Sequence, residues 1–327
     1  MTSLTNRIQF EPAIFHLRSH DIDKINDVLR SNHWQPQLIQ LEPGLLDSQY
    51  LIANLGGIQF ARVTINLALL HRSVSPHHTI TFALPLGTQP NCTWCGHPIS
   101  PQQIVVHQAN REVNLLGKGP KDLAVVTLDV DDFLVAAMPE DQALLEQLLS
   151  EKTYLLSVNR MAVLRLSHYL KEVFALVQSQ PNRATHPFMQ TIIRKDFLPL
   201  LLECLGTSQS VPESELSNRY QLVKQVEAYM LNHLDQPLTL QDLCAMTGSS
   251  KRRTLQTAFL EVFGISPMTY LKIQRLHGVR CQLKAAHPQT KTVVGIATRW
   301  GFWHMGHFSR DYKRMFGELP SQTLRRV

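Results

Sequence analysis

Apolar and polar residues alternate with a period of two in much of the first half of the chain, a pattern typical of β-strands. Two stretches show this alternation: Val63, Ile65, Leu67 and Leu69, then Ile80, Phe82 and Leu84. Shorter apolar runs follow at 104–106 and 123–130, separated by Pro-, Gly- and Asn-rich segments. Many short strands with intervening turns indicate a barrel or a sandwich. The pattern predicts a β-rich region over about 45–135.

After Pro139 the apolar residues recur at every third or fourth position, as on one face of an amphipathic helix. This spacing predicts helices at 142–150, 160–178 and 187–205, in a helical region over about 140–205. Two roles remain open for these helices. They could cover the β-rich region, or they could pair two subunits in a homodimer.

The segment 206–217 is rich in Ser, Glu and Pro, which indicates a linker. We therefore predict a sensor or dimerisation domain at 1–205 and a separate all-α domain at 218–327. At 327 residues the chain is longer than one hydrophobic core usually supports, which agrees with two domains. The fold class expected for the whole chain is α+β.

Two stretches of the C-terminal domain match each other at a fixed offset of 53 residues, which indicates an internal duplication. Ten pairs of physically similar residues share this offset: Thr239/Thr292, Leu240/Val293, Leu243/Ile296, Cys244/Ala297, Gly248/Gly301, Leu255/Phe308, Phe259/Tyr312, Phe263/Phe316, Gly264/Gly317 and Pro267/Pro320. Each copy has a short helix, a small residue where the next helix would cross it, and a glycine four positions later. A glycine there can adopt positive φ in a tight turn. The copies predict helix-turn-helix motifs at about 240–263 and 293–316.

The second helix of each predicted motif has one apolar face and one polar face. Polar and basic residues are left outward, and they have the chemistry that contacts phosphates and base edges in a major groove. The residues predicted to bind DNA are Ser250, Lys251, Arg252, Arg253, Gln256, Thr257, His304, His307, Ser309 and Arg310. The run 251–253 could be an ordinary solvated helix terminus, but positive charge at a helix N-terminus opposes the helix dipole, so a phosphate partner explains it better. Trp303 and His304 could instead pack across the turn.

A single helix is predicted between the copies, from Pro267 to Ala285, with an apolar stripe at Leu276, Val279 and Leu283. A rigid helix would fix the spacing of the two motifs. Two recognition helices could then enter successive major grooves, about 34 Å apart, so that one subunit reads an asymmetric site.

The net charge of +6 is divided unevenly between the two predicted domains. Residues 216–327 carry 16 Lys and Arg against 6 Asp and Glu, whereas residues 1–215 carry 16 against 20. A basic domain beside a mildly acidic one favours double-stranded DNA as the partner of the C-terminal part. No apolar run has the length of a membrane span or a signal peptide, so we expect a cytoplasmic protein without a membrane partner.

The C-terminal pattern resembles that of the AraC/XylS family of transcription regulators. The resemblance rests on Ile296–Ala297, Gly301–Phe302, Phe308–Arg310, Tyr312–Lys313, Phe316–Gly317 and Pro320, and it covers about Tyr220 to Arg326. Within the family it is nearest to the ethanolamine-utilisation regulators, at Asp242–Cys244, Arg252–Gln256, Ala258–Phe259 and Trp300–His304. That likeness to the subgroup fades before Asn218, so it assigns no effector.

The resemblance implies a sequence-specific transcription factor that activates a promoter in response to a small effector, with RNA polymerase as a further partner. It also implies an N-terminal sensing or dimerising domain, often a cupin-like barrel. In an alternative, the N-terminal domain only dimerises and no ligand is involved.

A metal or redox sensor is a further alternative, because the segment Cys92-Thr93-Trp94-Cys95-Gly96-His97 contains two thiols and a histidine. Cys92, Cys95 and His97 are its candidate ligands, with His107 as a fourth. A redox motif would need a helix after it, whereas this segment lies between strands and is predicted to be a hairpin, so we expect no metal. The other three cysteines are scattered, and reduced thiols are expected.

An enzyme is not expected, and a catalytic barrel tethered to DNA by the C-terminal domain is the alternative. No Ser-His-Asp arrangement, phosphate-binding loop or dinucleotide fingerprint is found, and no cofactor is predicted. His77 and His78 are adjacent, so on a strand they would point to opposite faces and could not share a metal.

Overall fold

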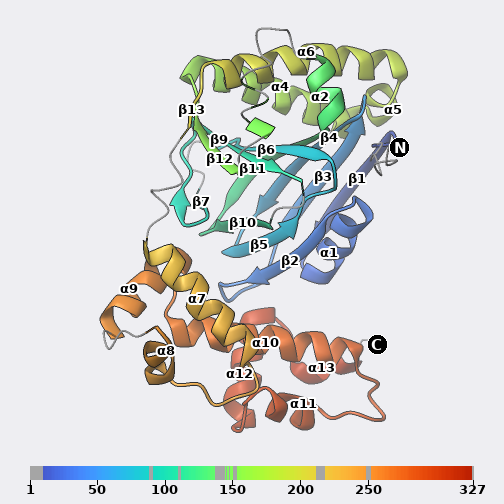
Figure 1. The fold of residues 1–327 in the computed structure, drawn as a ribbon. Coiled ribbons are helices and arrows are strands. Elements are labelled where there is room, and N and C mark those ends of the chain that lie inside the picture. The colour runs from blue at the N-terminus through green and yellow to red at the C-terminus, as the bar shows by residue number, and fades with distance from the viewer. Residues whose placement is uncertain are drawn as a thin grey trace, which may run out of the picture. The chain divides into compact units, whose positions relative to one another are not determined.

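The computed structural model describes residues 10–87, 91–109, 112–136, 144, 146, 148–149, 153–210, 218–247 and 252–325 (Figure 1). The chain divides into two compact units. The larger runs to Glu215 without the segments Ile39–Leu46 and Leu67–Leu70, and the smaller is Leu216–Val327 with these two segments. Much of the predicted linker at 206–217 lies outside the described residues, so its role stays a prediction.

Two β-sheets form the centre of the larger unit. One is antiparallel, with the order β1 (Ala13–Ser19), β3 (Ser48–Leu55), β4 (Ile58–Ile65), β11 (Lys121–Asp129), β6 (Thr79–Pro85), β9 (Gln103–Gln108), β12 (Thr153–Ser157) and β13 (Gln209–Ser210). The other has the order β2 (Gln35–Gln40), β5 (Leu69–Val74), β10 (Glu112–Gly117), β7 (Cys92–Trp94) and β8 (His97–Pro98). The predicted β-rich region is confirmed, and strands β1, β2, β12 and β13 extend it on both sides.

Five helices of the larger unit are described: α1 (Ile22–Ser31), α2 (Val130–Ala136), α4 (Arg160–Ser179), α5 (Pro181–Ala184) and α6 (Pro187–Gly206). The helices predicted at 160–178 and 187–205 are confirmed as α4 and α6. The helix predicted at 142–150 falls largely outside the described residues.

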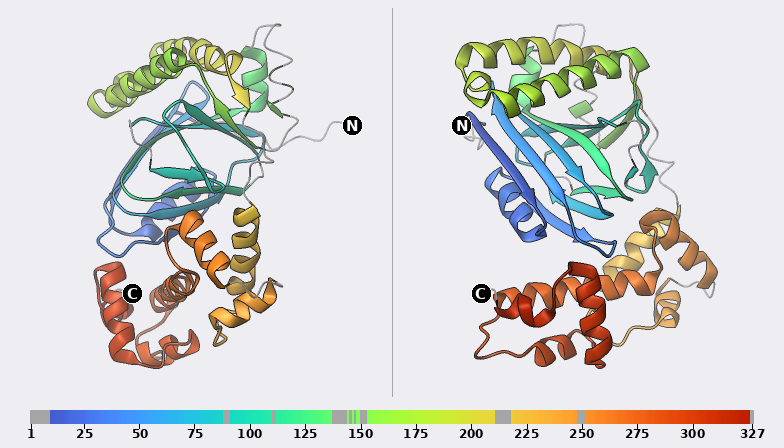
Figure 2. Two further views of the ribbon diagram at one scale, coloured as in Figure 1. Left: turned by 90° about the vertical axis from the view of Figure 1, so that its left-hand side faces the viewer. Right: turned by 180° about the vertical axis from the view of Figure 1, so that it is seen from behind.

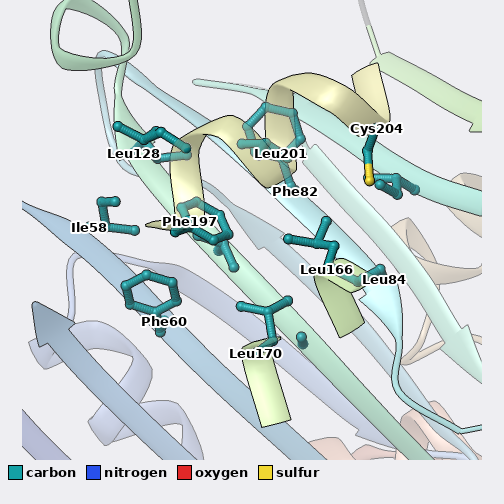
Figure 3. Close-up of a cluster of buried hydrophobic side chains, with 14 of the residues drawn as sticks. Ile58, Phe60, Phe82, Leu84, Leu128, Leu166, Leu170, Phe197, Leu201 and Cys204 are labelled. Carbon is teal, nitrogen blue, oxygen red and sulfur yellow. The ribbon is translucent and has the colours of Figure 1, made fainter. Parts of the chain in front are cut away.

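Helices α4 and α6 lie over one face of the eight-stranded sheet (Figures 1 and 2). A single apolar cluster joins them to the sheet, and Figure 3 shows Phe60 and Phe82 of the strands beside Leu166, Leu170 and Phe197 of the helices. The rings of Phe60 and Phe197 meet edge to face, with centroids 5.1 Å apart. The helical segment therefore covers the sheet, which is one of its two predicted roles.

Two details of the strand prediction were wrong. The alternation from Val63 to Leu69 crosses a turn, because β4 ends at Ile65 and β5 begins at Leu69. His77 and His78 lie in a turn before β6 rather than on a strand, and His78 has a positive φ of 57°.

Seven helices of the smaller unit are described: α7 (Asn218–Asn232), α8 (Leu240–Met246), α9 (Arg252–Phe263), α10 (Pro267–Ala285), α11 (Val293–Arg299), α12 (Met305–Phe316) and α13 (Pro320–Arg325). The pairs α8–α9 and α11–α12 are the two predicted helix-turn-helix motifs, and α10 is the predicted connecting helix. Its residues Leu276, Val279 and Leu283 are buried as expected. The predicted α+β fold class is confirmed.

A close helix contact within this unit involves Gly278 in the middle of α10. A Cβ atom added at Gly278 would lie 2.1 Å from the Trp300 ring, which belongs to the residue that ends α11. The indole therefore packs directly on the backbone of α10. This contact attaches the first helix of the second motif to the connecting helix.

The two motifs begin differently although they are copies. Thr239 and Asp242 form the complete capping box that their spacing suggests, because each side chain accepts a hydrogen bond from the other residue's backbone N–H. In the second copy Thr292 accepts from the N–H of Gly295, which has no side chain to return the bond.

No helix among the described segments combines the length and apolar character needed to cross a membrane.

Candidate nucleic-acid interface

The recognition helices α9 and α12 are fixed by the residues that the duplication predicts. Cys244 and Ala297, the small residues of each first helix, are buried. In the second turn Gly301 has a φ of +79°, which confirms the predicted left-handed conformation. Its counterpart Gly248 lies outside the described residues.

The inward face of α9 consists of Leu255, Ala258, Phe259, Val262 and Phe263, all buried as predicted. An aromatic cluster secures this face to α10, since the rings of Phe263 and Tyr270 are stacked with centroids 4.5 Å apart. The helix therefore has one defined orientation in the unit.

The polar face of α9 is accessible at its N-terminal end. Arg252, Arg253 and Gln256 are exposed, and Thr257 is half-buried. No ion pair of either arginine is found among the described residues. Two unpaired guanidinium groups thus extend from the first turn of a helix that can enter a groove. Ser250 and Lys251 lie just outside the described residues.

The second recognition helix, α12, presents a corresponding surface. His304, His307 and Arg310 are exposed, whereas Ser309 is half-buried. His304 occupies the N-cap position, but its side chain accepts no capping hydrogen bond. The rings of His304 and His307 lie 6.2 Å apart, so both imidazoles are at the same end of the helix.

Trp303, directly before this helix, is 72% exposed. The sequence left open whether it packs across the turn, and the exposure shows that most of its ring does not. An aromatic side chain beside two histidines adds apolar contact area to a surface otherwise suited to polar groups. It was not among the predicted DNA contacts, and its exposure could not be read from the sequence.

The opposite side of α12 is attached to α10 and α13. Lys272 on α10 forms an ion pair with Asp311 at 3.0 Å, and Arg280 lies over the Phe316 ring at 5.1 Å. The hydroxyl groups of Tyr312 and Thr323 are hydrogen-bonded at 2.9 Å. Asp311, the acidic residue of α12, is therefore ion-paired with α10. Arg310 has no carboxylate partner in the described part of the chain.

The cysteine segment is a hairpin, as predicted, formed by β7 and β8. Cys92 is buried, and burial raises the pKa of its thiol to about 11, so it is protonated at neutral pH. Cys95 has a positive φ of 47° in the turn. Among the described residues, Cys92, Cys95 and His97 do not form a group close enough to hold a metal ion.

One other group in the described residues, His78, Asp129 and Asp131, does bring three ligand atoms within 4.8 Å. The Asp129 carboxylate has a structural role there, because it accepts hydrogen bonds from the backbone N–H groups of Asp131 and Asp132 at the start of α2.

Comparison with known proteins agrees with this geometry. A family model described as a helix-turn-helix domain matches residues 243–326. The "Probable thc operon regulatory protein" of Rhodococcus erythropolis is 41% identical over 106 residues, which are 32% of this chain and 32% of that protein. The chain thus matches about a third of the length of this relative. "XylDLEGF operon transcriptional activator 1" of Pseudomonas putida is 24% identical over 277 residues, 83% of this chain and 82% of the relative.

A solved structure described as a probable AraC family transcriptional regulator from Rhodopseudomonas palustris CGA009 is 41% identical. The alignment covers 32% of this chain and 96% of that one, with a TM-score of 0.30. The helical unit that carries α9 and α12 is an AraC-type helix-turn-helix domain, and it matches the corresponding part of transcription regulators.

Proposed function

We propose that the protein is a sequence-specific transcription factor that binds promoter DNA through both AraC-type motifs and activates transcription in response to a small effector. The observation that carries this proposal is the pair of recognition helices with exposed N-terminal turns. Arg252 and Arg253 extend from one helix, and His307 and Arg310 from the other. No carboxylate among the described residues pairs with Arg252, Arg253 or Arg310, so these guanidinium groups are available to phosphates and to guanine edges.

Activation is proposed from the names of the relatives, several of which are operon activators. Contact with RNA polymerase is proposed as the way in which a DNA-bound activator would act. The larger unit is proposed to sense the effector and to pair two subunits. In the alternative version it pairs subunits only, and DNA binding is then independent of any ligand.

The test is selection of DNA from a random pool by the purified full-length protein, read by sequencing. We expect enrichment of one asymmetric motif with two parts about one helical turn apart. The matched variants Arg253→Ala and Lys171→Ala each remove one exposed positive charge, the first from α9 and the second from α4. Only Arg253→Ala should reduce the enrichment of the motif. Salt-sensitive binding without an enriched motif would contradict the proposal.

A further inference from the structure

The larger unit contains a cavity of about 580 Å³ between the start of β1, the β3–β4 turn and one face of α6. Its lining residues are Pro12, Gly56, Pro187, Gln190, Thr191, Arg194, Lys195 and Leu198. Pockets for small molecules typically measure about 300–1,000 Å³. The volume is therefore sufficient for a metabolite.

The wall formed by the β3–β4 turn is held rigidly against α6. Gly56 and Gly57 have φ values of +59° and +79°, as a two-residue hairpin loop requires. The Gly56 N–H donates to Oε1 of Gln190 at 2.9 Å, and the Gly56 carbonyl accepts from Nη1 of Arg194 at 3.1 Å. A Cβ atom on Gly56 would lie 2.9 Å from the Gln190 carbonyl oxygen, so only glycine allows this approach. The cavity is thus formed before any ligand arrives.

The charged side chains of the lining are both positive. They belong to Arg194 and Lys195, and among the residues that the structure describes no acidic one lines the cavity. The Asp132 carboxylate lies 3.6 Å from the guanidinium group of Arg194 and partly compensates its positive charge. Lys195 is exposed and has no ion pair within the described part of the chain. The lining therefore offers an ammonium group with unused capacity to bind an anion.

The remaining lining is suited to an apolar group. Leu198 forms one part, one helical turn beyond Arg194, and Pro12 and Pro187 form the rest. A ligand that satisfies both parts has an anionic end and an apolar body. Inorganic phosphate would leave the apolar part in water, and a neutral hydrocarbon would leave Lys195 without a counter-ion.

We propose that this cavity binds a small organic acid, with the carboxylate on Lys195 and Arg194 and the apolar body on Leu198, Pro12 and Pro187. That the bound acid is the effector rests on the proposed function. The binding itself does not depend on DNA.

The test is calorimetric titration of the full-length protein with octanoate, and with octanamide as its uncharged counterpart. Loss of one charge-assisted contact corresponds to about a tenfold weaker affinity. We expect this decrease for octanamide and for Lys195→Gln, but not for Lys171→Gln, which removes an exposed charge on α4. Thr191→Trp should abolish octanoate binding, because an indole at this exposed lining position fills the cavity.

The outcomes separate the cavity from the proposed function. Failure of octanoate to bind, equal binding of octanamide, or unchanged binding by both Lys195→Gln and Thr191→Trp would overturn the proposal. DNA binding is measured in parallel for each variant without octanoate and is expected to be unchanged. Octanoate binding by a protein that selects no DNA motif would support the cavity and contradict only the proposed function.

Discussion

Gly278→Ala tests whether the Trp300 ring fixes the second motif to α10. Ordinary contacts between carbon atoms are about 3.5–4.0 Å, whereas the new Cβ would lie 2.1, 2.2 and 2.5 Å from three carbons of the indole. The ring must therefore move by about 1.5 Å, or α10 must shift. Overpacking of this kind costs about 1–3 kcal/mol, and the better helix propensity of Ala offsets about 0.5–1 kcal/mol. Because the overlap with the ring is large, we use the upper half of the overpacking range, about 2–3 kcal/mol, and an offset of about 1 kcal/mol, which leaves an expected net loss of about 1–2 kcal/mol.

Hydrogen exchange measured by mass spectrometry suits this prediction, because it reports local stability in a chain with two units. Exchange in peptides from α10 and α11 should become about 5–30 times faster. Gly306→Ala is the matched control, since its Cβ would meet no atom within 4 Å in α12. Its exchange should be unchanged or slower. If Gly278→Ala exchanges no faster than the unmodified protein, the Trp300 contact is not tight and the reasoning is wrong.

Three further predictions concern single residues. Arg253→Ala should weaken binding to the selected motif by about 1–3 kcal/mol if the side chain contacts a base. If the side chain contacts only phosphate, the variant should bind all DNA sequences more weakly, and by an equal factor. Unchanged affinity in a fluorescence titration would exclude both contacts. Asp242→Ala removes one half of the capping box, so amide exchange should become faster at the start of α8; faster exchange confined to other helices would refute this. Burial lowers the pKa of His71 from 6.5 to about 3, and the positive charge of Lys121 contributes. Between pH 3 and pH 6.5 the folded state therefore binds fewer protons than the unfolded state. Stability of the larger unit should therefore fall as pH decreases from about 6.5 to about 3, and His71→Gln should reduce this dependence in urea unfolding; an identical pH profile for the variant would count against it.

The C-terminal unit could be predicted from the sequence in considerable detail. Its helices are defined by local periodicity and by a duplication, so each copy supports the interpretation of the other. The inward positions Leu255, Phe259, Phe308 and Tyr312 follow from helical spacing alone, and all four are buried. The family model that matches residues 243–326 agrees with what the repeat indicated.

Features assembled from distant segments could not be predicted. Strand β12 lies in a region of helical sequence and is defined by its pairing with β9, in which Leu155 is opposite Val105. The close approach of Gly278 and Trp300 has no periodic signal. The cavity also depends on three separate segments, because Pro12, Gly56 and α6 meet only after the sheet and its helices have formed.

Helices α8 and α11 begin with different numbers of capping hydrogen bonds, which affects how the sequences of the two copies can diverge. The complete capping box makes α8 less dependent on its neighbours, whereas α11 has only the Thr292 hydroxyl and the indole seated on Gly278. The first half therefore tolerates changes in its surroundings that would loosen the second. The two copies of the motif therefore differ in local stability, so substitutions at equivalent positions will have unequal effects.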